Sequence, residues 1–196
     1  MIWAVLVPAL LAGRQFPPGP LKRPWLTFMI FALLAVALAA QMMSPDLLPR
    51  FQREARAVAD GQVYRLFTAL WFQDGWLAGG IFNLTLLIFV GFTAEQIWRR
   101  AAWIGLYLGV ALAVEYLALS WQPIGAGNSI AVFALAGSLL GANRDRKFPI
   151  LALRAIGALA AVLLAWQHDI HGAAAVAGLL LGMLLRGTRA ARNQSI

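Results

Sequence analysis

The chain has 196 residues, of which 61% are hydrophobic and only 12% are charged, and its mean hydropathy is +0.73. An average soluble domain is roughly 45–50% apolar and about 25% charged. The composition therefore excludes an ordinary water-soluble globule and a disordered chain, and it predicts a protein that folds within a lipid bilayer. Cysteine is absent, which excludes disulfides, a thiolate nucleophile and any metal centre built on sulfur.

The formal net charge of +8 raises the question of a nucleic-acid partner. The basic side chains occur in short clusters between apolar runs instead of along one continuous face. This placement is typical of membrane topology, and we expect no nucleic-acid partner.

Six apolar runs are candidates for crossing about 30 Å of hydrocarbon, which takes roughly 20 helical residues. We therefore expect an all-α membrane protein, with a six-transmembrane-helix bundle over residues 25–187, an outer loop at 44–64 and a cytoplasmic tail at 188–196. The run at 129–142 is short unless the glycine-rich segment before it is also embedded. The six expected spans lie near 25–43, 71–98, 101–119, 129–142, 148–166 and 170–185.

Residues 1–24 are expected to form a cytoplasmic N-terminal tail. The stretch 2–12 is apolar but too short to span a bilayer, and a proline-rich segment follows it. No small-residue cleavage motif accompanies it, so a cleaved signal peptide is not expected. The pattern favours an interfacial or disordered segment.

The distribution of basic residues predicts the orientation of the spans. One set of loops carries most of the lysines and arginines, whereas the alternate loops carry few, mixed with acidic residues. By the positive-inside rule, both termini are then cytoplasmic. Segments 125–129 and 168–171 would lie near the outer face.

Ser129 directly follows a glycine-rich turn and begins an apolar helix. The unpaired N–H groups and the dipole at a helix N-terminus favour a developing anion, which suits an acyl-transfer nucleophile. Serine is also a preferred N-cap, so this feature alone leaves both interpretations open.

His171 begins a stripe of small residues, with Gly178 and Gly182 on the same helical face. The helix that Ser129 begins has a similar face, and small-residue faces let helices approach closely. If the two faces meet, Ser129 and His171 lie at the same depth, and the imidazole can take the hydroxyl proton. The plainer interpretation of His171 is an interhelical hydrogen bond.

Other polar residues have simpler interpretations. His168 and His171 have no third strong ligand nearby, so we expect no metal site and regard His168 as a loop or interface residue. Asp74, Glu95 and Glu115 could indicate a small transporter, but we find no interrupted helices in two matching halves. Glu95 is expected to form a structural ion pair with Arg99, four residues on.

Four features occur in order between residues 64 and 185. They are an aromatic-Arg segment at 64–68, Asn83 with Gly91 and Glu95 downstream, the run Gly127-Asn128-Ser129 before a helix, and His171 with Gly178 and Gly182. Together these features resemble the rhomboid family of intramembrane serine proteases.

The resemblance implies a Ser–His dyad without a third acid and without a cofactor. Ser129 would be the nucleophile and His171 the general base. Asn83 and the backbone N–H of Ser129 would stabilise the oxyanion, beside Gly127 of the glycine-serine box. Phe133 would pack against the imidazole.

This chain departs from the family pattern at several positions. Ile130 follows the serine, where the family usually has glycine, and Ala173 and Ala174 replace a glycine pair after His171. Asp74 and Gly79 stand where the family usually has two histidines, so one oxyanion donor is missing. Losing one such donor typically costs about 2.7–4 kcal/mol in the transition state.

The sequence therefore supports two functional hypotheses. The first is a rhomboid-type serine endopeptidase of a cell inner membrane, which cuts single-span membrane proteins near their outer ends. The alternative is a catalytically weak or inactive rhomboid-like protein that binds membrane helices.

Overall fold

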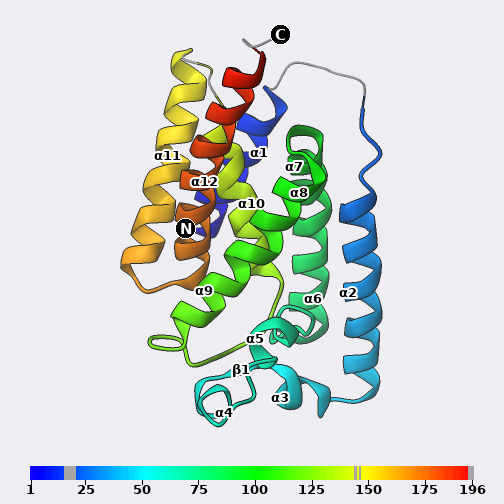
Figure 1. The fold of residues 1–196 in the computed structure, drawn as a ribbon. Helices are drawn as coiled ribbons and strands as arrows, with labels where there is room; N and C mark the ends of the chain where they lie inside the picture. Colours follow the sequence, from blue (N-terminus) through cyan, green and yellow to red (C-terminus); the bar gives the residue numbers. More distant parts are fainter. Residues whose placement is uncertain (16–20, 144, 146, 194–196) are drawn as a thin grey trace.

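A computed structural model of the chain describes all residues except 16–20, 144, 146 and 194–196, with side chains to residue 186. It is mostly helical, and Figure 1 shows the long helices side by side in one bundle. The helices before the central one are α1 (Ile2–Arg14), α2 (Trp25–Met43), α3 (Leu47–Phe51), α4 (Ala55–Ala59), α5 (Arg65–Thr68), α6 (Trp76–Leu86), α7 (Phe92–Ile97), α8 (Arg100–Ile104) and α9 (Val110–Ala118). The last three are α10 (Ser129–Ala142), α11 (Phe148–Trp166) and α12 (Ile170–Asn193).

Helices form at all six predicted spans. Two π-helical segments, η1 (Leu87–Gly91) and η2 (Gly105–Gly109), join α6 to α7 and α8 to α9, so each set makes one continuous rod. Four helices are long and apolar enough to cross a membrane, namely Trp25–Met43, Trp76–Ile97, Arg100–Ala118 and Phe148–Trp166. The apolar parts of α1, α10 and α12 are shorter.

α10 is the central helix, and every residue after Ser129 in it is buried. α12 packs along it through the small residues that the sequence pattern identified. A Cβ at Gly137 would overlap the carbonyl oxygen of Ala175, and one at Gly178 would overlap that of Ala134. The two faces therefore meet backbone to backbone, as the stripes predict.

The interpretation of the N-terminal stretch as an interfacial or disordered tail is wrong for residues 2–14. These residues form α1, which packs against α10 and α11 with Val5, Leu6 and Ala9 fully buried. α1 is too short to cross lipid, but neighbouring helices cover its buried face, while Trp3, Val7 and Leu11 on its other face are exposed.

α1 also changes the expected placement of the chain ends. Ile2 lies at the Ser129 end of α10, while the carbonyl of Ala12 accepts a hydrogen bond of 2.8 Å from Asn143 just beyond its other end. Arg186 of α12 donates to the carbonyls of Gly141 and Asn143. The first residues and the end of α12 thus lie at opposite ends of α10, whereas the sequence analysis expected both termini on one side.

The connection between α2 and α6 folds into a small cap at the Ser129 end of the bundle (Figure 1). Its short strand β1 (Arg53–Glu54) pairs antiparallel with β2 (Ile124–Gly125), just before the glycine-rich turn. The cap is thereby joined to the segment that positions Ser129.

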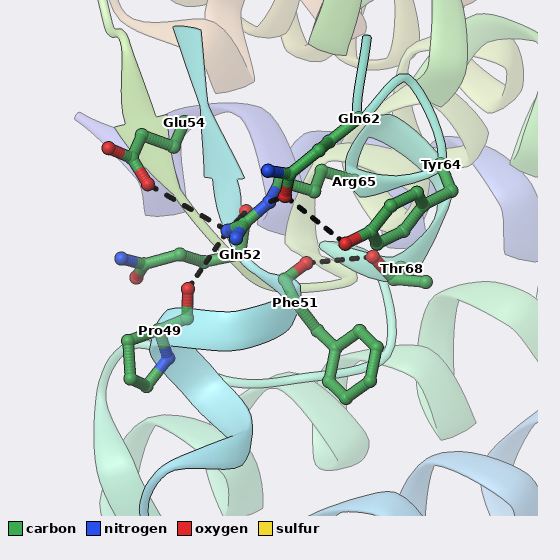
Figure 2. Close-up of polar contacts among 8 residues, drawn as sticks. All are labelled: Pro49, Phe51, Gln52, Glu54, Gln62, Tyr64, Arg65 and Thr68. Carbon is green, nitrogen blue, oxygen red and sulfur yellow. Dashed lines mark hydrogen bonds and ion pairs between the residues drawn. The ribbon is translucent and has the colours of Figure 1, made fainter. Parts of the chain in front are cut away.

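Arg65 holds this cap together (Figure 2). Its guanidinium donates to the backbone carbonyls of Pro49 and Gln52 at 2.9 and 3.2 Å, and its Nε donates to the side chain of Gln62 at 2.7 Å. The Glu54 carboxylate lies 3.8 Å from it. The arginine of the 64–68 segment therefore has a structural role, which is to satisfy backbone carbonyls at the end of the short helix α3.

Candidate active site

The turn before α10 sets the position of Ser129. Gly127 has a φ of +140°, which favours glycine, and its N–H donates to the carbonyl of Ala69 at 2.8 Å. Asn128 is the N-cap residue and Ser129 is the first residue of the helix. The serine is therefore not the N-cap, and its backbone N–H is among those that lack an intrahelical partner.

The hydroxyl of Ser129 contacts His171. Oγ lies 2.9 Å from Nε2 of the imidazole, across the α10–α12 interface. The ring of Phe133, one turn along α10, packs on the imidazole with centroids 4.9 Å apart and planes inclined by 60°. The structure thus brings together three of the residues that sequence reasoning singled out, at hydrogen-bond and ring-contact distances.

The other ring nitrogen of His171 has a partner that the sequence analysis did not expect. Nδ1 lies 2.8 Å from Oδ1 of Asp169, and the same oxygen accepts the backbone N–H of His171 at 2.8 Å. Hydrogen bonding to His171 is the main cause that holds the pKa of the Asp169 carboxyl below its ordinary value. The expectation of an imidazole without an acid partner is therefore wrong in geometric terms. The only sequence signal for this contact was that Asp169 lies two positions before His171.

Asn83 of α6 belongs to a buried chain of amide side chains. Its Nδ2 donates to Oε1 of Gln73 at 2.7 Å, and Nε2 of Gln73 donates to Oδ1 of Asn128 at 3.2 Å. Gln41 of α2 exchanges two further hydrogen bonds with the backbone of Gln73. Sequence reasoning missed Gln73, which fixes the rotamer of Asn83 and ties it to the turn before Ser129.

The candidate site contains one cavity of about 220 Å³. All five predicted site residues line it: Asn83, Gly127, Ser129, Phe133 and His171. The three departures from the family pattern closest to the site also line it, namely Asp74, Gly79 and Ile130, and so does Ile2 of α1. A Cβ at Gly79 would meet nothing within 4 Å, so the cavity is open where the family usually has histidine.

Arg53 is one of the polar residues that line this cavity. Its side chain is 1% exposed and makes an ion pair with Glu115 of α9, which is fully buried. Because the carboxylate is paired, Glu115 has a structural role. It is therefore no longer evidence for the transporter hypothesis, which rested on three intramembrane acids.

Glu95 also has partners other than the one expected. Its carboxylate accepts hydrogen bonds from the backbone N–H groups of Leu26 and Thr27 at 3.1 and 2.9 Å, and from the Thr27 hydroxyl at 2.8 Å. The predicted ion pair with Arg99 is therefore wrong. The acid instead satisfies the first turn of α2, where unpaired N–H groups attract negative charge.

Nothing in the described part of the chain groups three His, Cys, Asp or Glu side chains around a possible metal ion. His168 lies exposed in the turn before α12. The arrangement in the cavity is instead one of a hydroxyl, an imidazole and amide donors, which together can activate an oxygen nucleophile and stabilise an oxyanion.

Comparison with known families gives one match. Residues 60–192 match the family model described as the Rhomboid domain, which is well over half of the chain and includes Asn83, Ser129 and His171. No curated protein matches this chain significantly.

Proposed function

Since the chain belongs to the rhomboid family, we propose that it is an intramembrane serine endopeptidase with Ser129 as nucleophile and His171 as general base. Family membership and four membrane-length apolar helices make it a multi-pass membrane protein. The observation that carries the proposal is the 2.9 Å contact between Ser129 Oγ and His171 Nε2 in a cavity large enough for several water molecules.

The proposed reaction has two halves. Oγ of Ser129 attacks the peptide carbonyl while Nε2 of His171 takes the hydroxyl proton, and the imidazolium then gives that proton to the leaving amine. Water then attacks the carbonyl of the acyl-enzyme while the imidazole takes one of the water protons. The imidazolium returns that proton to Oγ of Ser129 as the new carboxyl terminus leaves.

Two donors support the oxyanion. The backbone N–H of Ser129 is unpaired within the helix, and Asn83 gives one of its two amide hydrogens to Gln73, which leaves the second for a ligand in the cavity. We propose single-span proteins of the cell inner membrane as substrates, with no nucleic-acid partner. A helical substrate must unwind locally to present its carbonyl to Ser129.

The proposal is tested by cleavage of single-span reporter proteins in reconstituted membranes. Wild type should cut a reporter near its outer end, and Ser129→Ala and His171→Ala should not. Ser138→Ala is the matched control, because Ser138 is also on α10 but bonds to Trp98 and Leu135 away from the cavity. Equal cleavage by wild type and both site variants would refute the proposal.

One observation favours the alternative, a weak or inactive helix-binding protein. Gly79 leaves open space and no side-chain donor at the cavity wall. If this loss limits activity, Gly79→His should raise the cleavage rate, whereas Gly79→Leu, which fills the space without a donor, should not. Failure of a fluorophosphonate to label Ser129 in folded protein would favour the alternative.

A further inference from the structure

The turn between α11 and α12 places a carboxylate against the proposed general base. Asp169 Oδ1 lies 2.8 Å from His171 Nδ1, and Nε2 on the opposite side of the ring contacts Ser129. The side chains of Asp169 and His171 are 35% and 25% exposed, so both are partly shielded from water. Hydroxyl, imidazole and carboxylate therefore form one continuous hydrogen-bonded line.

This line determines which ring nitrogen carries the proton. A carboxylate can only accept, so its contact with Nδ1 requires an N–H there. In the neutral ring the lone pair then lies on Nε2, which faces Ser129, as a general base requires. The lowered pKa of the Asp169 carboxyl, caused mainly by this hydrogen bond, keeps it ionised at neutral pH.

We propose that Asp169 is a positioning residue that holds His171 in the reactive tautomer and stabilises its imidazolium form, so that the chain uses three residues instead of two. The inference rests on the proposed function of Ser129 and His171. The same arrangement of hydroxyl, imidazole and acid serves serine proteases of unrelated folds.

Helix capping is the simpler role for Asp169, and the structure allows the two roles to be separated. Oδ1 accepts the backbone N–H of His171, and the Asp169 carbonyl accepts those of Gly172 and Ala173 at 3.1 and 3.3 Å. A cap needs only these contacts. Asp145 supplies a comparison, because its Oδ1 accepts the N–H of Lys147, also two residues on, at 2.9 Å, in the turn at the other end of the bundle.

Other charges near the imidazole are accounted for. Arg53 and Asp74 line the same cavity, but Arg53 is paired with Glu115 and Asp74 is exposed before α6. The adjacent His168 is exposed in the turn. Among the described residues, Asp169 is the one carboxylate within hydrogen-bond distance of His171.

The test compares Asp169→Asn, Asp169→Ser and Asp145→Asn. Asparagine keeps the cap and an acceptor but removes the charge, and serine keeps the cap but is too short to reach Nδ1. We expect both Asp169 variants to lose about 10- to 100-fold in kcat with little change in KM, as for a charged hydrogen bond.

A readout without activity separates this inference from the proposed function. The chain has only two histidines, so ¹⁵N NMR of the imidazoles with His168→Gln leaves one ring to observe. At neutral pH, wild type and Asp145→Asn should show His171 protonated at Nδ1, and Asp169→Ser should show a tautomer mixture. If the wild type cuts no reporter while this tautomer result holds, the proposed function fails and the inference that Asp169 sets the His171 tautomer stands. If all variants share one tautomer and one kcat, Asp169 is only a cap and the inference is overturned.

Discussion

Gly178→Ala tests whether the close α10–α12 contact sets the geometry of the site. A Cβ at residue 178 would overlap the carbonyl oxygen of Ala134 and lie 2.8 Å from its carbonyl carbon. Carbon atoms in contact are about 3.5–4.0 Å apart, so the helices have to separate by about 1 Å. The same displacement would stretch the 2.9 Å contact between Ser129 and His171 beyond hydrogen-bond range.

A misplacement of about 1 Å costs on the order of 10²-fold in rate, and overpacking of this kind costs about 1–3 kcal/mol in stability. We therefore expect fluorophosphonate labelling of Ser129 to slow by about 10²-fold, with a lower midpoint of thermal unfolding in detergent. The matched control is Gly109→Ala, because a Cβ there meets nothing within 4 Å. Labelling of Gly178→Ala at the wild-type rate would refute the argument that helix contact aligns the two residues.

Three further changes have defined outcomes. Asn83→Ala removes an oxyanion donor and should lower kcat by about 10²–10³-fold without unfolding the protein, as measured by cleavage and thermal unfolding; an unchanged kcat would remove Asn83 from the site. Glu115→Leu leaves the buried Arg53 charge without its partner and should cost about 3–5 kcal/mol in equilibrium unfolding, whereas a loss below about 1 kcal/mol would contradict a buried pair. The pKa of the Asp169 carboxyl is lower in the folded protein than its ordinary value, so the ionised carboxyl stabilises the fold above the ordinary pKa, and this stability is lost as pH falls through the folded-state pKa. Acid should therefore lower the thermal unfolding midpoint of wild type more than that of Asp169→Asn. Equal acid sensitivity of the two proteins would contradict this.

Patterns that depend on spacing along one helix were readable from the sequence. Gly137 on α10 and Gly178 on α12 mark faces that close packing requires, and the structure joins those faces with Ser129 opposite His171. The predicted spans could be located for the same reason, because hydrophobic length and helical period are local properties of the chain.

Features that depend on which elements become neighbours could not be read in the same way. α1 fails the length criterion for lipid, but that criterion does not reveal a short helix that packs one face on α10 and α11. The i+4 spacing favours a Glu95–Arg99 pair, yet the start of α2 supplies three donors to the carboxylate that no local pattern reveals.

The same limit applied inside the site. Gln73 orients Asn83 from a non-helical segment ten residues earlier in the chain, and its polar side chain carries no motif. The distance between the Asp169 carboxylate and the His171 imidazole depends on the rotamers of the two side chains. Their spacing in the sequence does not distinguish that contact from a helix cap.

The central claim is that Ser129 is a nucleophile activated by His171, and covalent modification tests it most directly. Folded protein in reconstituted membranes is treated with a fluorophosphonate, and the adduct is located by peptide mass spectrometry. The account predicts one adduct, on Ser129, that disappears in His171→Ala and persists in Ser138→Ala. An unmodified Ser129 in the wild type, or equal labelling with and without His171, would contradict it.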